Sequence, residues 1–210
     1  TVIESEQVYS NSNEKVLGMI QLQSSVNHSK TNNIDFIFVI DHSISMSVEN
    51  KLAYVQATIE YILDRLNQNH RICLIGYNHE ITNYTEGLQI VNEENKNRIV
   101  NYMKMIKPSG STNISDALLT AFEIVRFREH DIEIFSPQNI NPVPSRLVTI
   151  FLFTDGFTNI ESSDELLFEE IMKNNSDLPQ GLTIHTFAYG KENNFKLLRT
   201  QFRVLLRTIY

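Results

Sequence analysis

The chain has 210 residues, 41% hydrophobic and 20% charged, a composition that suits one globular domain with a sizeable core and argues against disorder. Its net charge of -7 would repel a phosphate backbone, so nucleic acid is not an expected partner. No stretch approaches the ~18 apolar residues of a membrane span, the first residues are too polar for a signal peptide, and a single cysteine excludes an internal disulfide; we therefore expect a cytoplasmic protein that does not contact membranes.

The first third of the chain predicts an extension, a strand and a helix. Residues 1–32 form an N-terminal extension with one candidate strand at about 15–23. Residues 34–40 are an almost unbroken apolar run rich in β-branched and aromatic side chains, which predicts a strand buried on both faces. Apolar residues at the spacing of one helical face then predict an amphipathic helix that starts near Asn50 and reaches Leu66.

The middle of the chain repeats this alternation. Residues 71–77 predict a second buried strand, and the polar, glycine-containing stretch 78–87 indicates an edge hairpin. A helix with Asn92 as its N-cap is expected to run to about residue 106. After a loop rich in Pro, Ser and Gly, a third helix should begin within residues 112–115.

The last part of the chain adds two more strands and one irregular segment. Residues 128–145 carry three of the five prolines and no consistent period, which indicates an inserted surface loop. Residues 147–153 and 182–189 predict buried strands, with a helix expected between them at about 163–173. Apolar residues at helical spacing within 191–210 predict a divergent C-terminal helix.

Strands that alternate with helices predict a fold for residues 33–210. We expect a Rossmann-like α/β domain with a doubly wound, mostly parallel sheet, helices on both faces and one antiparallel edge strand. Binding sites in such sheets lie outside the carboxyl ends of the strands. Polar, turn-forming residues follow two of the predicted strands, at 41–45 and at 154–156, so a site is expected there.

Five oxygen-bearing residues are candidates for a metal site at this edge. Asp41 and Asp155 directly follow buried strands, and two ionised carboxylates left together without a counter-charge would be costly. Ser43 and Ser45 lie on the turn after Asp41, and Thr112 can approach from a neighbouring loop. Hard oxygen ligands suit Mg²⁺, with Mn²⁺ or Ca²⁺ as alternatives, and disfavour Zn²⁺.

These motifs resemble the metal-ion-dependent adhesion site of von Willebrand factor A domains. The resemblance covers residues 33–190 and rests on three motifs, Asp41-x-Ser43-x-Ser45, Gly110-Ser111-Thr112-Asn113 and Asp155-Gly156. The sequence looks most like the intracellular or inter-alpha-inhibitor-like branches of that family. The resemblance implies that these serines bind the metal directly, that the threonine and aspartates bind directly or through water, and that an Asp or Glu of a protein ligand completes the coordination.

Other interpretations remain open. Taken singly, Asp41 and Asp155 are better explained as caps of helices or turns, Ser43 or Ser45 as the N-cap of the helix near Asn50, and Thr112 as the N-cap of the third helix; together the five residues favour a metal site. The domain could be a scaffold with a vestigial metal site, because the branched residue Ile44 separates the two serines. A Mg²⁺-dependent phosphoryl hydrolase with Asp41 as nucleophile is less favoured, because the sequence has no second Asp two residues on and no phosphate-binding loop. We expect binding rather than catalysis.

Overall fold

The chain divides into two compact units, residues 1–31 and residues 32–210. In the first unit, strands β1 (Val2–Ile3) and β2 (Leu22–Gln23) pair antiparallel. The strand predicted at 15–23 overlaps β2 at its last two residues, and its remainder lies outside the described part of the chain. The computed structural model describes residues 2–3, 22–23, 33–128, 146–155, 178–179 and 181–190.

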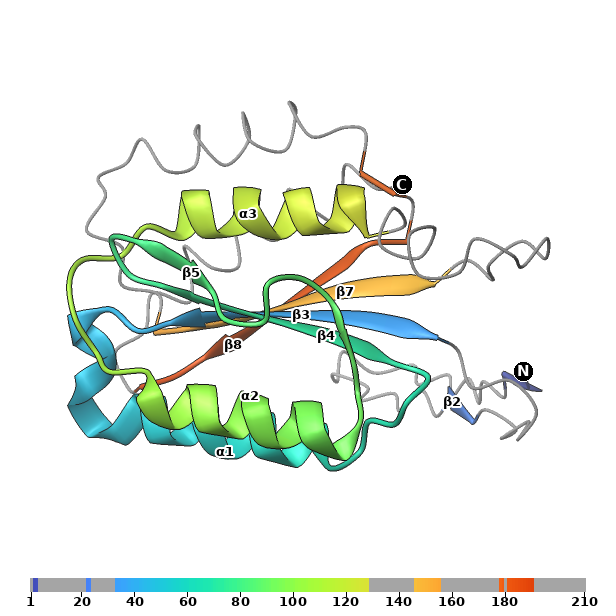
Figure 1. Cartoon of the computed structure of the whole chain (residues 1–210), viewed down its shortest axis with the longest axis horizontal. Coiled ribbons are helices and arrows are strands. Elements are labelled where there is room, and N and C mark those ends of the chain that lie inside the picture. Colours follow the sequence, from blue (N-terminus) through green and yellow to red (C-terminus); the bar gives the residue numbers. More distant parts are fainter. Residues whose placement is uncertain are drawn as a thin grey trace, which may run out of the picture. The chain divides into compact units, whose positions relative to one another are not determined.

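The second unit is built on a six-stranded, mostly parallel sheet (Figure 1). The strand order is β5-β4-β3-β7-β8, and β6 also pairs with β4. Strands β3, β4, β7 and β8 are parallel, whereas β5 and β6 are antiparallel to β4. The predicted fold class is confirmed, although the antiparallel edge consists of two short strands rather than one. The strands are β3 (Ile34–Asp41), β4 (Arg71–Tyr77), β5 (Ile81–Asn83), β6 (Gln89–Ile90), β7 (Leu147–Thr154) and β8 (Thr183–Ala188).

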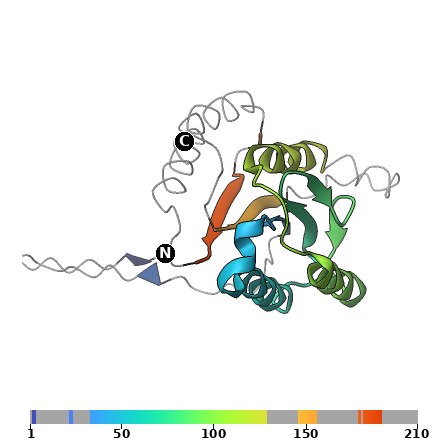
Figure 2. The same ribbon diagram turned by 90° about the vertical axis from the view of Figure 1, so that its left-hand side faces the viewer.

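Helices cover both faces of this sheet (Figures 1 and 2). Helices α1 (Lys51–Leu63) and α2 (Glu93–Met105) lie on one face, and α3 (Ile114–Phe127) lies on the other. The central strand β3 feeds two cores, because alternate residues point to opposite faces. Phe38 and Ile40 pack with α1 and α2, whereas Ile37 and Val39 pack with α3. This double burial explains why the run 34–40 is almost continuously apolar.

The helix ends follow local chemistry in some places and not in others. Asn92 caps α2 as predicted, with its side chain accepting a hydrogen bond of 2.8 Å from the N–H of Asn95. Helix α1 ends at Leu63, earlier than the predicted Leu66. Before α1, residues Ile44–Asn50 form a kinked 3₁₀ helix, η1, that the sequence pattern did not predict.

A buried charge cluster lies at the amino-terminal end of the parallel strands, opposite the end that carries the polar turns. Asp35, near the start of β3, is fully buried and accepts hydrogen bonds from Arg71 at 2.9 and 2.7 Å and from Arg146 at 2.6 Å. The Nε atom of Arg128 lies 3.9 Å from the same carboxylate. Arg71 and Arg128 are also buried, so this cluster joins β3, β4, α3 and the start of β7.

Several predicted segments lie outside the described residues. These are almost all of the insertion 128–145, the helix expected at 163–173 and the C-terminal helix 191–210. Among the residues that the structure does describe, no helix has both the length and the apolar character needed to cross a membrane.

Candidate metal centre

Two buried aspartates meet at the carboxyl end of the sheet. Asp41 is the last residue of β3, and Asp155 directly follows β7. Because these neighbouring strands run parallel, both aspartates lie at the carboxyl end of the sheet. Both side chains are 0% exposed. Burial raises the pKa of Asp41 and the charge of Asp155 raises it further, while hydrogen bonds from Ser43 and Thr154 lower it. The pair therefore places two carboxylates together away from solvent, a setting that favours positive charge nearby.

The two serines lie on the turn that follows Asp41. The N–H of Ser43 donates to Oδ1 of Asp41 at 2.9 Å, which folds the turn back over the aspartate. The Oγ atoms of Ser43 and Ser45 are 3.1 Å apart, so the two hydroxyls are close enough to approach one cation. Ser43 makes no side-chain cap bond to η1, and the N-cap position of α1 is Asn50. Ser43 therefore stands at the N-cap position of η1 without a side-chain cap bond, and neither serine is the N-cap of α1.

Thr112 is brought to the same edge by backbone hydrogen bonds. The N–H of Ile44 donates to the carbonyl of Gly110 at 3.1 Å, and the N–H of Ser109 donates to the carbonyl of His42 at 2.8 Å. These bonds join the loop that carries the buried Thr112 to the serine turn. Asn113, rather than Thr112, caps α3 by accepting from the N–H of Asp116. The cap interpretation of Thr112 is therefore wrong.

The structure adds three residues that are not among the five predicted metal ligands. Thr154 donates from Oγ1 to Oδ2 of Asp41 at 2.8 Å, and the hydroxyl of Tyr77 lies 3.4 Å from the same oxygen. Lys51 donates from Nζ to Oδ2 of Asp155 at 2.9 Å and lies 3.4 Å from the carbonyl oxygen of Ser45. Thr154 could have been suspected from its place beside Asp155. Lys51 lies on a predicted amphipathic helix, whose charged residues are expected to face solvent.

Ile44 does not fill the space between the serines. Its side chain is 61% exposed, and its backbone N–H bonds to Gly110. The branched residue is therefore accommodated with its side chain toward solvent. His42, by contrast, is buried, with its ring over Gly76: a Cβ atom at Gly76 would lie 3.2 Å from Cδ2 of this histidine.

The donors that gather here fit a hard divalent cation. The two buried carboxylates lie at the ends of β3 and β7, and the two adjacent serine hydroxyls lie on the turn after β3. Thr112 lies on the adjoining loop. Within the described ranges, no group of three or more His, Cys, Asp or Glu side chains is placed to hold a metal. The candidate donors are therefore hydroxyl and carboxylate oxygens. Oxygen donors suit Mg²⁺, Mn²⁺ or Ca²⁺ better than Zn²⁺, which prefers His and Cys ligands.

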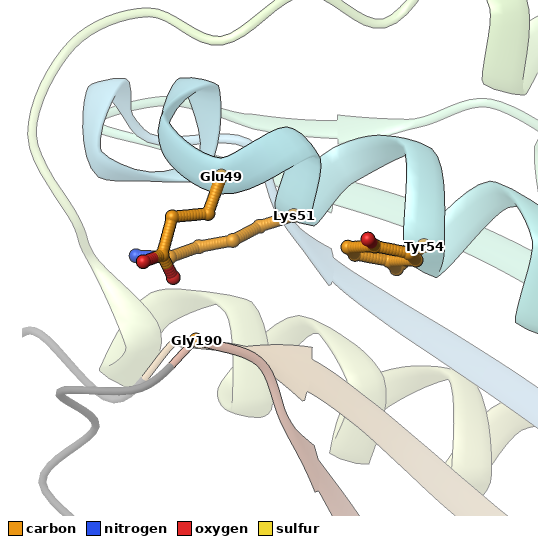
Figure 3. A pocket seen from close by; sticks show the side chains of 4 residues that line it. All are labelled: Glu49, Lys51, Tyr54 and Gly190. Atoms are coloured by element: carbon orange, nitrogen blue, oxygen red, sulfur yellow. The ribbon is translucent and has the colours of Figure 1, made fainter.

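A pocket of about 390 Å³ adjoins these residues. Glu49, Lys51 and Tyr54 line it from η1 and α1, and Gly190 lines it from the segment after β8 (Figure 3). Tyr54 is 60% exposed. Lys51 is common to the pocket and to the aspartate cluster, so the pocket opens beside the candidate metal centre.

Known proteins match this chain in both sequence and fold. The family model of the von Willebrand factor type A domain matches residues 36–157, more than half of the chain. Inter alpha-trypsin inhibitor heavy chain 4 of Mus musculus is 31% identical over 160 residues, which are 72% of this chain and 16% of that protein. Heavy chain H2 of Sus scrofa is 26% identical over 166 residues, 79% of this chain and 16% of that protein. The chain thus spans about a sixth of the length of these relatives.

Two solved structures share the fold at lower identity. Manganese-loaded TRAP protein of Plasmodium vivax has a TM-score of 0.51 at 15% identity, and the match covers 81% of this chain and 62% of that one. Proximal thread matrix protein 1 of the mussel byssus, with a zinc-occupied metal-ion-dependent adhesion site, has a TM-score of 0.54 at 21% identity, covering 81% and 39%. Likeness at these identities establishes the fold alone.

Proposed function

The chain belongs to the von Willebrand factor type A domain family, and we propose from this membership and its polar cluster that it is a divalent-metal-dependent protein-interaction module. The proposed ligand is a protein that presents an aspartate or glutamate side chain. The observation that carries the proposal is the meeting of the buried Asp41 and Asp155 beside the paired hydroxyls of Ser43 and Ser45.

The proposed metal ligands are the five residues expected from the sequence. Ser43 and Ser45 would offer adjacent hydroxyls, Thr112 a third, and Asp41 and Asp155 the two carboxylates. Mg²⁺ is the proposed ion, with Mn²⁺ or Ca²⁺ as alternatives. When bound, the ion would supply a Lewis-acidic position for a ligand carboxylate. The two carboxylates would only balance the charge of a dication, and since Mg²⁺ takes six ligands, five protein donors would leave one position for an acidic ligand group.

Related folds support a divalent ion at this edge. Of the two structural neighbours, one is manganese-loaded and the other has a zinc-occupied metal-ion-dependent adhesion site. Their ions differ from the proposed Mg²⁺. The choice of Mg²⁺ therefore rests on the oxygen donors of this chain. The similarity to the inter-alpha-trypsin inhibitor heavy chains supports the assignment to the family, and we infer no binding partner from it.

Binding fits the cluster better than phosphoryl hydrolysis. A nucleophilic Asp41 would need a carboxylate oxygen available for in-line attack. Its Oδ1 accepts from the N–H of Ser43, and its Oδ2 accepts from Thr154 and faces the hydroxyl of Tyr77. These bonds fix the orientation of the carboxylate, as would suit the proposed metal ligand. His42, the nearest histidine in sequence, packs over Gly76.

Calorimetric titration with Mg²⁺ and Mn²⁺ tests the metal site. The unaltered protein should bind one ion and gain thermal stability, because a ligand specific to the folded state raises stability by mass action. Asp41→Ala should abolish both effects, whereas Asp64→Ala, which removes an exposed carboxylate at the end of α1, should leave them unchanged. Absence of any response at millimolar Mg²⁺ or Mn²⁺ would favour a scaffold with a vestigial site.

A matched pair of peptides tests the acidic ligand. An Asp-containing peptide should bind in Mn²⁺ and lose binding in EDTA, and the same peptide with Asn should not bind in either buffer. Equal binding of both peptides would contradict recognition through a carboxylate, even if the metal itself binds.

A further inference from the structure

A buried lysine already contacts one of the two aspartates at this edge. The side chain of Lys51 is 8% exposed, and its Nζ atom lies 2.9 Å from Oδ2 of Asp155. The same ammonium lies 3.4 Å from the carbonyl oxygen of Ser45. A positive charge is therefore built into the cluster that we propose to hold a dication.

The fold directs Lys51 inward from the start of α1. Glu49 and Asn50 both have φ of 56°, in the left-handed region, and this kink turns the chain from η1 into α1. The stem of Lys51 then passes close to Gly190 (Figure 3). A Cβ atom at Gly190 would lie 2.7 Å from Cε of Lys51, so the missing side chain leaves room for the lysine.

We propose that Lys51 is a built-in counter-ion that competes with the divalent metal for Asp155 and so sets the metal affinity of the site. This inference rests on the proposed metal-dependent function. A dication that binds Asp155 must displace or repel the ammonium of Lys51. The two positive charges would contact the same carboxylate, and like charges so close together repel strongly away from bulk water. Binding then becomes an exchange of one cation for another, which is weaker than binding to two unpaired carboxylates.

The adjoining pocket gives the displaced lysine a place to go. Lys51 lines this space of about 390 Å³ together with Glu49 and Tyr54, so its flexible side chain can leave Asp155 without entering the protein core. The carboxylate of Glu49 lines the same space and would favour the ammonium there electrostatically. Lys51 is thus a positioning residue that acts on the metal through Asp155.

The test compares metal binding by three forms of the protein. Lys51→Met keeps a long unbranched side chain and removes the charge, and Lys104→Met makes the same change at an exposed position of α2. Calorimetry should show that Lys51→Met binds Mn²⁺ about tenfold more tightly than the unaltered protein, a difference of about 1.4 kcal/mol. Lys104→Met should stay within about twofold of the unaltered protein.

Thermal melting separates competition from a purely structural role. In EDTA, Lys51→Met should melt at a lower temperature, because two buried carboxylates lose their counter-charge. Saturating Mn²⁺ should raise its melting temperature by more than it raises that of the unaltered protein. A lysine that only supports the fold would produce the first effect without the second, and that result would overturn the proposal.

The affinities also distinguish this inference from the proposed function. If the unaltered protein and Lys51→Met bind Mn²⁺ equally, or the variant binds more weakly, competition is refuted while the metal site stands. If neither form binds, both proposals fail. Binding by Lys51→Met alone would support competition in its strongest form.

A measurement on the unaltered protein covers the case in which Lys51→Met does not fold. Amine acetylation followed by mass spectrometry should label Lys51 slowly in EDTA and faster at saturating Mn²⁺, with Lys104 labelled equally in both. Continued protection of Lys51 while Mn²⁺ is bound would overturn the proposal, because the ammonium would not have left Asp155.

Discussion

Replacing Asp35 by asparagine should destabilise the protein severely, although Asp35 lies at the other end of β3 from the proposed metal centre. The substitution keeps the size of the side chain and removes its charge. Three arginines would then surround a neutral amide in a site where the carboxylate is 0% exposed. Breaking a buried ion pair by removing one partner leaves uncompensated buried charge, which typically costs about 3–5 kcal/mol.

The contacts support a value in that range. Arg71 donates to both oxygens of Asp35, at 2.9 and 2.7 Å, and Arg146 donates to Oδ1 at 2.6 Å. The arginine side chains are only 10–13% exposed, so water cannot easily replace the lost carboxylate. For a domain of this size, each kcal/mol lowers the melting temperature by roughly 2–4 °C, so we expect a fall of roughly 6–20 °C.

Urea denaturation and thermal melting measure the effect. Glu93→Gln provides the control, because it breaks an ion pair of 3.1 Å with Lys96 in which the glutamate side chain is 87% exposed. That change should cost less than about 1 kcal/mol. If Asp35→Asn also costs less than about 1 kcal/mol, the buried cluster contributes little to the stability of this end of the sheet. Metal affinity should be unaffected by Asp35→Asn wherever the variant remains folded.

Three further predictions concern single groups. Asn92→Ala should lower the free energy of unfolding by about 1 kcal/mol through loss of the α2 cap, measured by urea denaturation; an unchanged midpoint would contradict this role. Burial raises the pKa of the Cys73 thiol to about 11, so iodoacetamide should label it at neutral pH only as fast as the protein unfolds; immediate labelling would refute that burial. Burial, followed by repulsion from Arg146, lowers the pKa of His70 below 6.5, with Asp35 opposing the shift. The unfolded state therefore takes up a proton first as pH falls through 6.5, so stability should decline as the pH falls below that value, and less steeply in His70→Gln; equal slopes would exclude this contribution.

The sequence predicted the parts of this protein that depend on local periodicity. The strands β3, β4 and β7 fall within one residue of the predicted ranges, because double burial requires nearly continuous apolar runs. Asn92 and the second helix were predicted because a side-chain cap is a contact within four residues. Helix η1 was not predicted. Its kink depends on a left-handed backbone at Glu49 and Asn50, and neither residue type by itself indicates that conformation.

By itself, the sequence determined where the polar edge lies and that its donors are oxygen atoms. Asp41 and Asp155 each end a buried strand, and parallel neighbouring strands must deliver their ends to the same edge. Only the tertiary structure decided which charges meet there. Lys51 and Asp155 are 104 residues apart, as Arg146 and Asp35 are 111 apart, and a periodic pattern reports the burial of one element but not its partner across the sheet. The position of Lys51 at the start of α1 therefore decided that a lysine, and not solvent, faces the aspartate proposed to bind the metal.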